Sequence, residues 1–208
     1  MTYANRQEAG EVLSNLLTDY ANAPQTLVLA LPRGGVPVAY PIAKRLHLNL
    51  ELIFVRKIGA PQHAEFAIGA IASHDIVLLD ESSIESLHIS DKALGDIIEA
   101  EKNELDRREK LYKSTCKIKN KRIILVDDGI ATGHTMSAAI LAIKKRHPKE
   151  IIIAVPVASQ EALLNLTLMV DKVICPLMPD QFDAVGKWYQ DFSQTTDEQV
   201  ITLLKDFR

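Results

Sequence analysis

The sequence predicts an α/β fold, in which a parallel β-sheet of about five strands is flanked by helices on both faces. Short continuous apolar runs, typical of strands that are buried on both faces, alternate along the chain with helical patterns. This alternation favours a parallel sheet. In addition, four of the nine glycines fall at two strand-to-helix junctions, Gly34-Gly35 and Gly129/Gly133. Concentrated glycine at such junctions favours close approach of the backbone to a ligand.

The elements follow from apolar spacing and turn residues. Five apolar runs are predicted to form the main sheet: residues 26–31, 50–55, 123–126, 150–157 and 173–175. Helical spacing predicts five helices, of which the third is long and solvated: 4–22, 36–46, 90–113, 134–146 and 158–168. Between the second strand and the long helix, residues 56–61 are expected to form a cationic loop, and residues 66–72 and 76–79 a hairpin outside the main sheet.

Composition excludes several classes of protein. The 208 residues carry 24 Lys and Arg against 27 Asp and Glu, a net charge of −3, which argues against extended nucleic acid and anionic membranes as partners. The longest apolar run, 151–158, is far shorter than the roughly 20 residues of a membrane-spanning helix. No secretory signal is visible, so we expect a cytoplasmic protein. Cys116 and Cys175 lie far apart and are expected to be packing residues.

The most informative segment is residues 122–136, in which an apolar strand ends in the adjacent carboxylates Asp127 and Asp128. A small-residue loop with two threonines then opens a helix. Backbone N–H groups at a helix N-terminus form a receptor for phosphate. Carboxylates beside a phosphate are tolerated when the same ligand offers them hydroxyl donors, as a phosphorylated sugar does. The alternative is purely structural, with Asp128-Gly129 as a turn and Thr132 as a helix cap.

Residues 123–135 resemble the phosphoribosyl-pyrophosphate (PRPP) signature of the type I phosphoribosyltransferases. The resemblance implies the type I fold, with a small hood and a mobile loop or hairpin excursion. It implies that Asp127 and Asp128 bind the ribose hydroxyls. It further implies that the 5-phosphate is cradled by five residues of the loop: Ala131, Thr132, Gly133, His134 and Thr135. His134 stands where the family often has a small residue, but its backbone N–H can still donate.

Two further segments match the family. Leu31 to Gly35 lies where the family places its pyrophosphate loop, which implies that Arg33, Gly34 and Gly35 hold the diphosphate. Arg56 and Lys57 resemble a basic stretch that precedes the mobile catalytic loop, and they would stabilise the departing diphosphate.

Each of these two matches has a structural alternative. An Arg-Gly-Gly sequence alone is more often a turn, and Arg56-Lys57 is alternatively a solvated pair of cations. Whether His63 or Glu65 in the excursion touches the substrate is left open.

The resemblance implies Mg²⁺-dependent transfer of a 5-phosphoribosyl group from PRPP to a nitrogenous acceptor, with release of diphosphate. Mg²⁺ would bind mainly through phosphates, and through ribose hydroxyls or water to Asp127 and Asp128. Either carboxylate is also a candidate general base. The alternative is a PRPP- or nucleotide-binding regulator that has the same fold and little catalysis.

The acceptor is less defined. In purine-specific relatives, the segment after the final strand supplies an aromatic residue that stacks on the base and an acid that approaches the metal. The resemblance therefore makes Phe182, Trp188 and Tyr189 candidate stacking groups and Asp191 a weak candidate acid, with packing in the hood as the alternative for the aromatic residues. In 6-oxopurine enzymes of the family, the strand after the PRPP helix carries a lysine for the oxo group. Residues 150–159 contain no Lys or Arg, so the resemblance counts against hypoxanthine or guanine. Arg107 and Arg108 on the long helix are expected to form surface pairs such as Glu104 with Arg108.

The resemblance also guides the expected organisation. Residues 1–208 are expected to form one phosphoribosyltransferase domain. Its core would span roughly 24–178, its excursion roughly 56–90 and its C-terminal hood roughly 179–208. The family commonly forms dimers, so a homodimer is expected.

Overall fold

The computed structural model describes residues 2–61, 63–73, 76–112 and 117–208, without the side chains of Ala64 and Glu65. The expectations for Glu65 and Cys116 therefore concern groups outside the described part of the chain.

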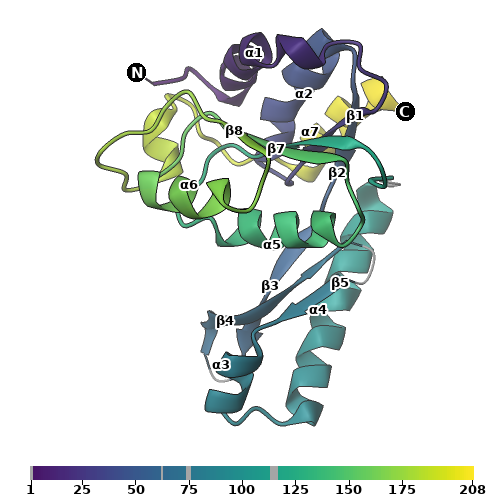
Figure 1. The fold of residues 1–208 in the computed structure, drawn as a ribbon, viewed down its shortest axis with the longest axis vertical. Helices are drawn as coiled ribbons and strands as arrows, with labels where there is room; N and C mark the ends of the chain where they lie inside the picture. Colours follow the sequence, from purple (N-terminus) through teal and green to yellow (C-terminus); the bar gives the residue numbers. More distant parts are fainter. Residues whose placement is uncertain (1, 62, 74–75, 113–116) are drawn as a thin grey trace.

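The main sheet has five parallel strands in the order β2-β1-β6-β7-β8 (Figure 1). The strands are β1 (Thr26–Ala30), β2 (Asn49–Leu52), β6 (Arg122–Val126), β7 (Glu150–Ala154) and β8 (Lys172–Ile174). Their number, direction and places in the sequence confirm the predicted α/β class. The order of the strands puts β1 and β6 side by side at the centre, so the loops that follow them leave the same edge of the sheet.

Helices cover both faces of this sheet. They are α1 (Arg6–Leu16), α2 (Gly35–Leu46), α5 (His134–Lys144), α6 (Gln160–Thr167) and α7 (Asp197–Leu204). Alternate residues of the central strands point to opposite faces, as in any β-strand. Val28 and Ile124 join a buried cluster with α1, α2 and α7, whereas Leu29 and Leu125 join a second cluster with α5 and α6. Burial on both faces explains why the strands are continuous apolar runs.

A second, antiparallel sheet projects from the first as an arm (Figure 1). It contains β3 (Val55–Ala60), β4 (His63–Ala72) and β5 (Ile76–Leu79), which are followed by α3 (Glu81–Ser86) and α4 (Asp91–Tyr112). The expectation of a loop at residues 56–61 was wrong, because residues 56–60 pair with β4 as part of strand β3. Ile58 and Ala60 are buried there. Pro61 lies in the turn between β3 and β4, whereas Gly59 lies within the strand, where the pairing with β4 is irregular.

The segment around Tyr3 pairs with the segment around Trp188, which lies well before the C-terminus. The N–H of Tyr3 donates to the carbonyl of Trp188, and the N–H of Gln190 donates to the carbonyl of Tyr3, both at 2.8 Å. The last segments are three short helices, the 3₁₀ turns Val185–Trp188 and Lys205–Phe207 and the helix α7 between them. Phe182 lies outside any helix. The helix α7 was not predicted from the sequence.

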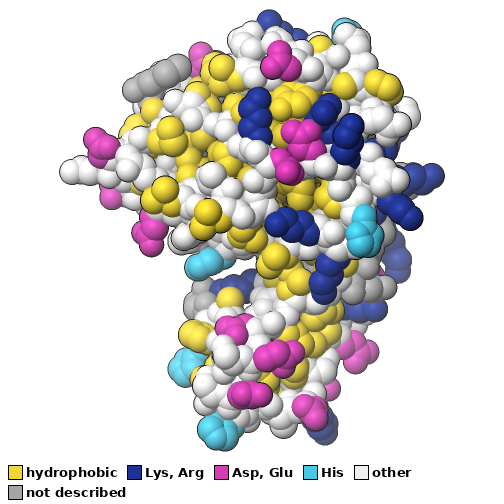
Figure 2. All heavy atoms as spheres, in the orientation of Figure 1, with side chains coloured by type: hydrophobic (Ala, Val, Ile, Leu, Met, Phe, Trp, Pro, Cys, Tyr) yellow, Lys and Arg dark blue, Asp and Glu magenta, His cyan; other side chains and the backbone are white. Residues whose placement is uncertain are grey.

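On the face shown in Figure 2, Lys and Arg side chains gather around a few acidic side chains on the part of the molecule that holds the five-stranded sheet. None of the helices in the described residues is both long and apolar enough to cross a membrane.

Candidate active site

Two loops meet at the carboxyl edge of the five-stranded sheet, one after β1 and one after β6. Ala30 lies opposite Val126 in the register of the two strands, and the N–H of Leu31 donates to the carbonyl of Val126 at 2.9 Å. A Cβ atom added to Gly34 would lie 2.1 Å from Oδ2 of Asp128. The glycine loop and the acid pair are therefore in direct contact, and a residue with a side chain does not fit at Gly34 without displacing the carboxylate.

The acid pair lies in a partly buried environment at the end of β6. Oδ1 of Asp127 accepts a hydrogen bond from the N–H of Asp128 at 2.8 Å. Burial raises the pKa of Asp127 well above its ordinary value, and the charge of Asp128 raises it further. Burial also raises the pKa of Asp128, against the opposing effect of Arg6. The two carboxyl groups are thus distinct, because Asp128 has a cationic partner and Asp127 has mainly its acidic neighbour.

Arg6 is a site residue that sequence reasoning missed. Its Nε donates to Oδ2 of Asp128 at 2.8 Å, and its Nη1 donates to the carbonyl of Ser193 at 2.8 Å. The guanidinium carbon lies 3.9 Å from the ring centroid of Phe192, within the range of a cation–π contact. The side chains of Arg6 and Asp128 are only 11% and 16% exposed. Nothing in the apolar periodicity of the first helix distinguishes Arg6 from an ordinary surface arginine.

Aromatic residues of the segment 182–189 pack next to the acid pair. The hydroxyl of Tyr189 donates to the carbonyl of Asp128 at 2.5 Å. Phe182 and Trp188 stack on each other, with ring centroids 6.5 Å apart and planes at 24°. Both pack against a small buried cluster that contains Tyr3 and Tyr189. This arrangement is the packing in the hood that was the alternative to stacking on the acceptor. The rings of Phe182 and Trp188 are nevertheless only partly buried.

The loop between β6 and α5 has the shape expected of a phosphate receptor. Gly133 has a φ of +78°, in the left-handed region that favours glycine, and it is the N-cap residue of α5. The side chains of Thr132, His134 and Thr135 are exposed around it. Ser159, the N-cap residue of α6, holds the loop in place, because its hydroxyl donates to the carbonyl of Ala131 at 2.6 Å. The first N–H groups of an α-helix lack partners within the helix and attract anions.

The predicted cations lie at the same edge but have different surroundings. Nη1 of Arg33 is 3.5 Å from Oδ1 of Asp197, which belongs to α7. Arg56 forms an ion pair with Glu101 of α4. Lys57 is exposed and lines a cavity of about 320 Å³ together with His134 and Thr135, the first two residues of α5.

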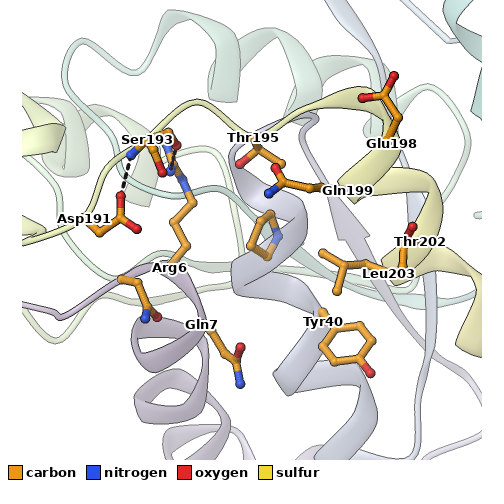
Figure 3. A pocket seen from close by; sticks show the side chains of 12 residues that line it. Arg6, Gln7, Tyr40, Asp191, Ser193, Thr195, Glu198, Gln199, Thr202 and Leu203 are labelled. Carbon is orange, nitrogen blue, oxygen red and sulfur yellow. Dashed lines mark hydrogen bonds between the residues drawn. The ribbon is translucent and has the colours of Figure 1, made fainter.

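Arg6 also lines a larger cavity, of about 500 Å³, between the start of α1, α2 and α7 (Figure 3). Most of the residues that line it have polar side chains, among them Gln7, Tyr40 and Gln199. Asp191, the weak candidate acid, lines this cavity and accepts a hydrogen bond from the N–H of Ser193 at 2.9 Å. The structure thus groups Asp191 with Arg6 at this cavity.

Comparison with known proteins assigns the family. Residues 3–186 match the family described as the phosphoribosyl transferase domain. Two proteins of Mycobacterium tuberculosis, from strains CDC 1551 and H37Rv, are each 32% identical over 97% of this chain and carry phosphoribosyl transferase in their names. The chain spans 46% of the length of these curated relatives. The chain belongs to the phosphoribosyl transferase domain family, whose enzymes are of the glycosyltransferase class.

Two solved structures resemble this chain in fold. The crystal structure of TT1426 from Thermus thermophilus is 35% identical, covers 100% of this chain and 99% of its own, and has a TM-score of 0.86. The AQ2163 protein of Aquifex aeolicus is 13% identical over 87% of this chain and 78% of its own, with a TM-score of 0.54, and shares the fold.

The contact between the two loops leads to a stability prediction for Gly35. An alanine Cβ there would lie 2.7 Å from the carbonyl oxygen of Val126 and 3.0 Å from Cα of Asp127, which are backbone atoms that cannot rotate away. We expect Gly35→Ala to lower the free energy of unfolding by about 2 kcal/mol, as overpacking does. Urea denaturation measures the change.

The matched control is Gly95→Ala, in the second turn of α4, where an added Cβ meets no atom within 4 Å. Alanine has the higher helix propensity, so this variant should gain about 0.5–1 kcal/mol. Equal effects of the two substitutions would contradict the close approach at Gly35.

Proposed function

We propose that the chain transfers a 5-phosphoribosyl group from PRPP to a nitrogenous acceptor and releases diphosphate. The observation that carries the proposal is the contact between the glycine loop after β1 and the acid pair after β6. Ligands of parallel α/β sheets bind beyond the carboxyl ends of the strands, at this edge. A ligand with a vicinal diol and phosphate groups suits both loops, because one offers carboxylates and the other backbone donors with a guanidinium.

Each group of site residues is proposed to bind a different part of PRPP. In this proposal Asp127 and Asp128 accept hydrogen bonds from the ribose hydroxyls and hold the ring, and the loop 131–135 binds the 5-phosphate. Arg33 and the two glycines after it hold the diphosphate. Arg56 and Lys57 stabilise the negative charge that develops on the diphosphate as it leaves. Asp127, with its raised pKa, is the better placed of the two acids to receive a proton from the acceptor.

Mg²⁺ is proposed as the cofactor. Among the described residues, no group of three or more His, Cys, Asp and Glu side chains could hold a metal ion. Mg²⁺ commonly binds through one or two carboxylates and substrate phosphates, keeping several waters, and the acid pair fits that role. Asp127 and Asp128 would hold the ion through ribose hydroxyls or water, and the bound ion would neutralise charge on the diphosphate.

The acceptor is proposed to be a nucleobase or a related amine. Phe182 and Trp188 form a short aromatic stack that a planar acceptor would extend. The lack of Lys and Arg in residues 150–159 still argues against a 6-oxopurine.

We further propose that residues 1–208 act as one domain and that the chain works as a cytoplasmic homodimer. Contacts of the N-terminal segment support a single unit, because the segment around Tyr3 pairs with the segment around Trp188 and Arg6 reaches Asp128. The net charge of −3 supports a small anionic substrate over extended nucleic acid.

Release of diphosphate tests the proposed function. The protein would be incubated with PRPP and Mg²⁺ across a panel of purines, pyrimidines and small amines, and diphosphate measured by a coupled assay. We expect release that depends on at least one acceptor. PRPP binding without release for any acceptor would refute the enzyme and favour the regulatory alternative.

A further inference from the structure

A small basic cavity lies beside the glycine loop, between the arm and the C-terminal helix. It has a volume of about 160 Å³ and is lined by residues that include Arg33, Arg107, Arg108, Tyr112 and Asp197. The lining therefore carries three guanidinium groups against one carboxylate. Pockets that hold drug-sized ligands are larger, roughly 300–1,000 Å³. The size and charge of this cavity suit a small oxyanion.

The arginines come from two different parts of the fold. Arg33 belongs to the loop after β1, whereas Arg107 and Arg108 come from the last turns of α4, on the arm. Both α4 arginines bond to Glu104, at 2.7 and 2.9 Å, as the sequence analysis expected for Arg108. Those bonds anchor the guanidinium groups on one side, and the groups still line the cavity. The two arginines therefore have a second environment, the cavity, which the spacing of residues along the helix does not reveal.

A carboxylate from α7 already lies among these cations. Oδ1 of Asp197 accepts a hydrogen bond from the hydroxyl of Tyr112 at 2.5 Å and lies 3.5 Å from Nη1 of Arg33. These neighbours hold the pKa of Asp197 below its ordinary value, the hydrogen bond from Tyr112 being the largest cause. Asp197 thus stays ionised beside Arg33, in the position that an external oxyanion would compete for.

The cavity also lies along the direction that a bound PRPP would take. In the sheet, β1 stands between β6, which ends in the acid pair, and β2, which leads into the arm. Arg33 precedes Gly34, which contacts Asp128, and Arg33 itself lines the cavity. A ligand whose sugar lies over the acid pair and whose diphosphate lies over the β1 loop would therefore reach this cavity.

We infer that this cavity is an oxyanion site, in which Arg107 and Arg108 of α4 act together with Arg33 to bind a phosphate or diphosphate group. Guanidinium groups bind phosphate oxygens in a planar, bidentate geometry. The inference rests on the proposed function as far as the diphosphate of PRPP is the source of that group. A free phosphate ion has the same chemistry, and the experiment below separates the two.

Isothermal titration without Mg²⁺ tests the site, with inorganic diphosphate, inorganic phosphate and ribose 5-phosphate as probes. Arg107→Gln and Arg108→Gln should each weaken diphosphate binding about tenfold, the loss of one charge-assisted hydrogen bond. Ribose 5-phosphate has no diphosphate and should bind all variants equally. Lys110→Gln is the matched control, since it removes one charge from the same helix and Lys110 does not line the cavity.

A substitution of the opposite sign makes the test sharper. Asp197→Asn removes the competing carboxylate and keeps an oxygen that can accept from Tyr112, so it should tighten diphosphate binding several-fold. A residue that only supported the fold would weaken binding when replaced. Thermal denaturation of each variant checks that the fold is retained, and Arg108→Lys, which restores the charge, should recover part of the affinity.

The outcomes separate this inference from the proposed function. Diphosphate affinity that is unchanged in the Arg107 and Arg108 variants, equal loss in Lys110→Gln, or no diphosphate or phosphate binding by the unmodified protein would overturn the oxyanion site. Diphosphate release with an acceptor could persist in each of those cases. Phosphate binding that depends on the arginines, without diphosphate binding, would assign the cavity to free phosphate.

Discussion

Replacing both Asp127 and Asp128 by Asn is expected to weaken PRPP binding at least a hundredfold, although the protein still folds. The two carboxyl groups lie half-buried at the carboxyl end of a central strand, where carboxylate oxygens are the strongest available acceptors for the ribose hydroxyls. Two lost charge-assisted hydrogen bonds, each of about 1.5–3 kcal/mol, account for that factor. Isothermal titration with PRPP and Mg²⁺ measures the loss, and circular dichroism checks the fold.

The control for this experiment is Asp19→Asn, an exposed carboxylate in the turn before β1. It removes one negative charge without touching the sheet edge, so PRPP should bind it as it binds the unmodified protein. A dissociation constant that is unchanged in the double variant would refute the assignment of the acid pair to the ribose. A large drop in the melting temperature would instead show that the pair has a structural role.

Arg6→Gln is expected to destabilise the protein by about 2 kcal/mol at pH 7 and by much less at acidic pH. Breaking a buried ion pair by removing one partner costs about 3–5 kcal/mol, and some exposure of Arg6 and Asp128 reduces that figure. Without Arg6, burial raises the pKa of Asp128 further, since the guanidinium is what opposes the rise.

The pH dependence has a definite sign. When folding raises the pKa of a carboxyl group, the group stabilises the folded state at pH values below its pKa in the unfolded chain. That stabilisation is lost as the pH rises through its pKa in the folded state. The difference in unfolding free energy between Arg6→Gln and the unmodified protein should therefore grow from acidic to neutral pH. Urea denaturation at several pH values measures it. Arg45→Gln, an exposed arginine of α2, is the control, and a pH-independent loss in Arg6→Gln would contradict the role of the ion pair.

Much of the fold was predictable because its signals are local. The strands β1, β6 and β7 are buried on both faces and so read as continuous apolar runs, and the helices that follow them have apolar stripes. The segment β3 was not predictable, since residues 56–60 carry Arg, Lys and Gly, are followed by Pro61 in a turn, and become a strand only by pairing with β4. The helix α7 is short, and most of its stabilisation comes from packing on α2 and the first buried cluster.

Some features of the candidate site were likewise predictable from the sequence, and others were not. The sequence alone determined where the acid pair, the loop 131–135 and the glycine loop lie as candidate site segments, because each is a continuous stretch whose functional groups stand on adjacent residues. Only the tertiary structure decided that Arg6, 122 positions before Asp128, binds its carboxylate, and that Arg107 and Arg108 of α4 line a cavity with Arg33. Ion pairs and cavities join residues that are distant in the chain, and their geometry is fixed by packing rather than by any local pattern.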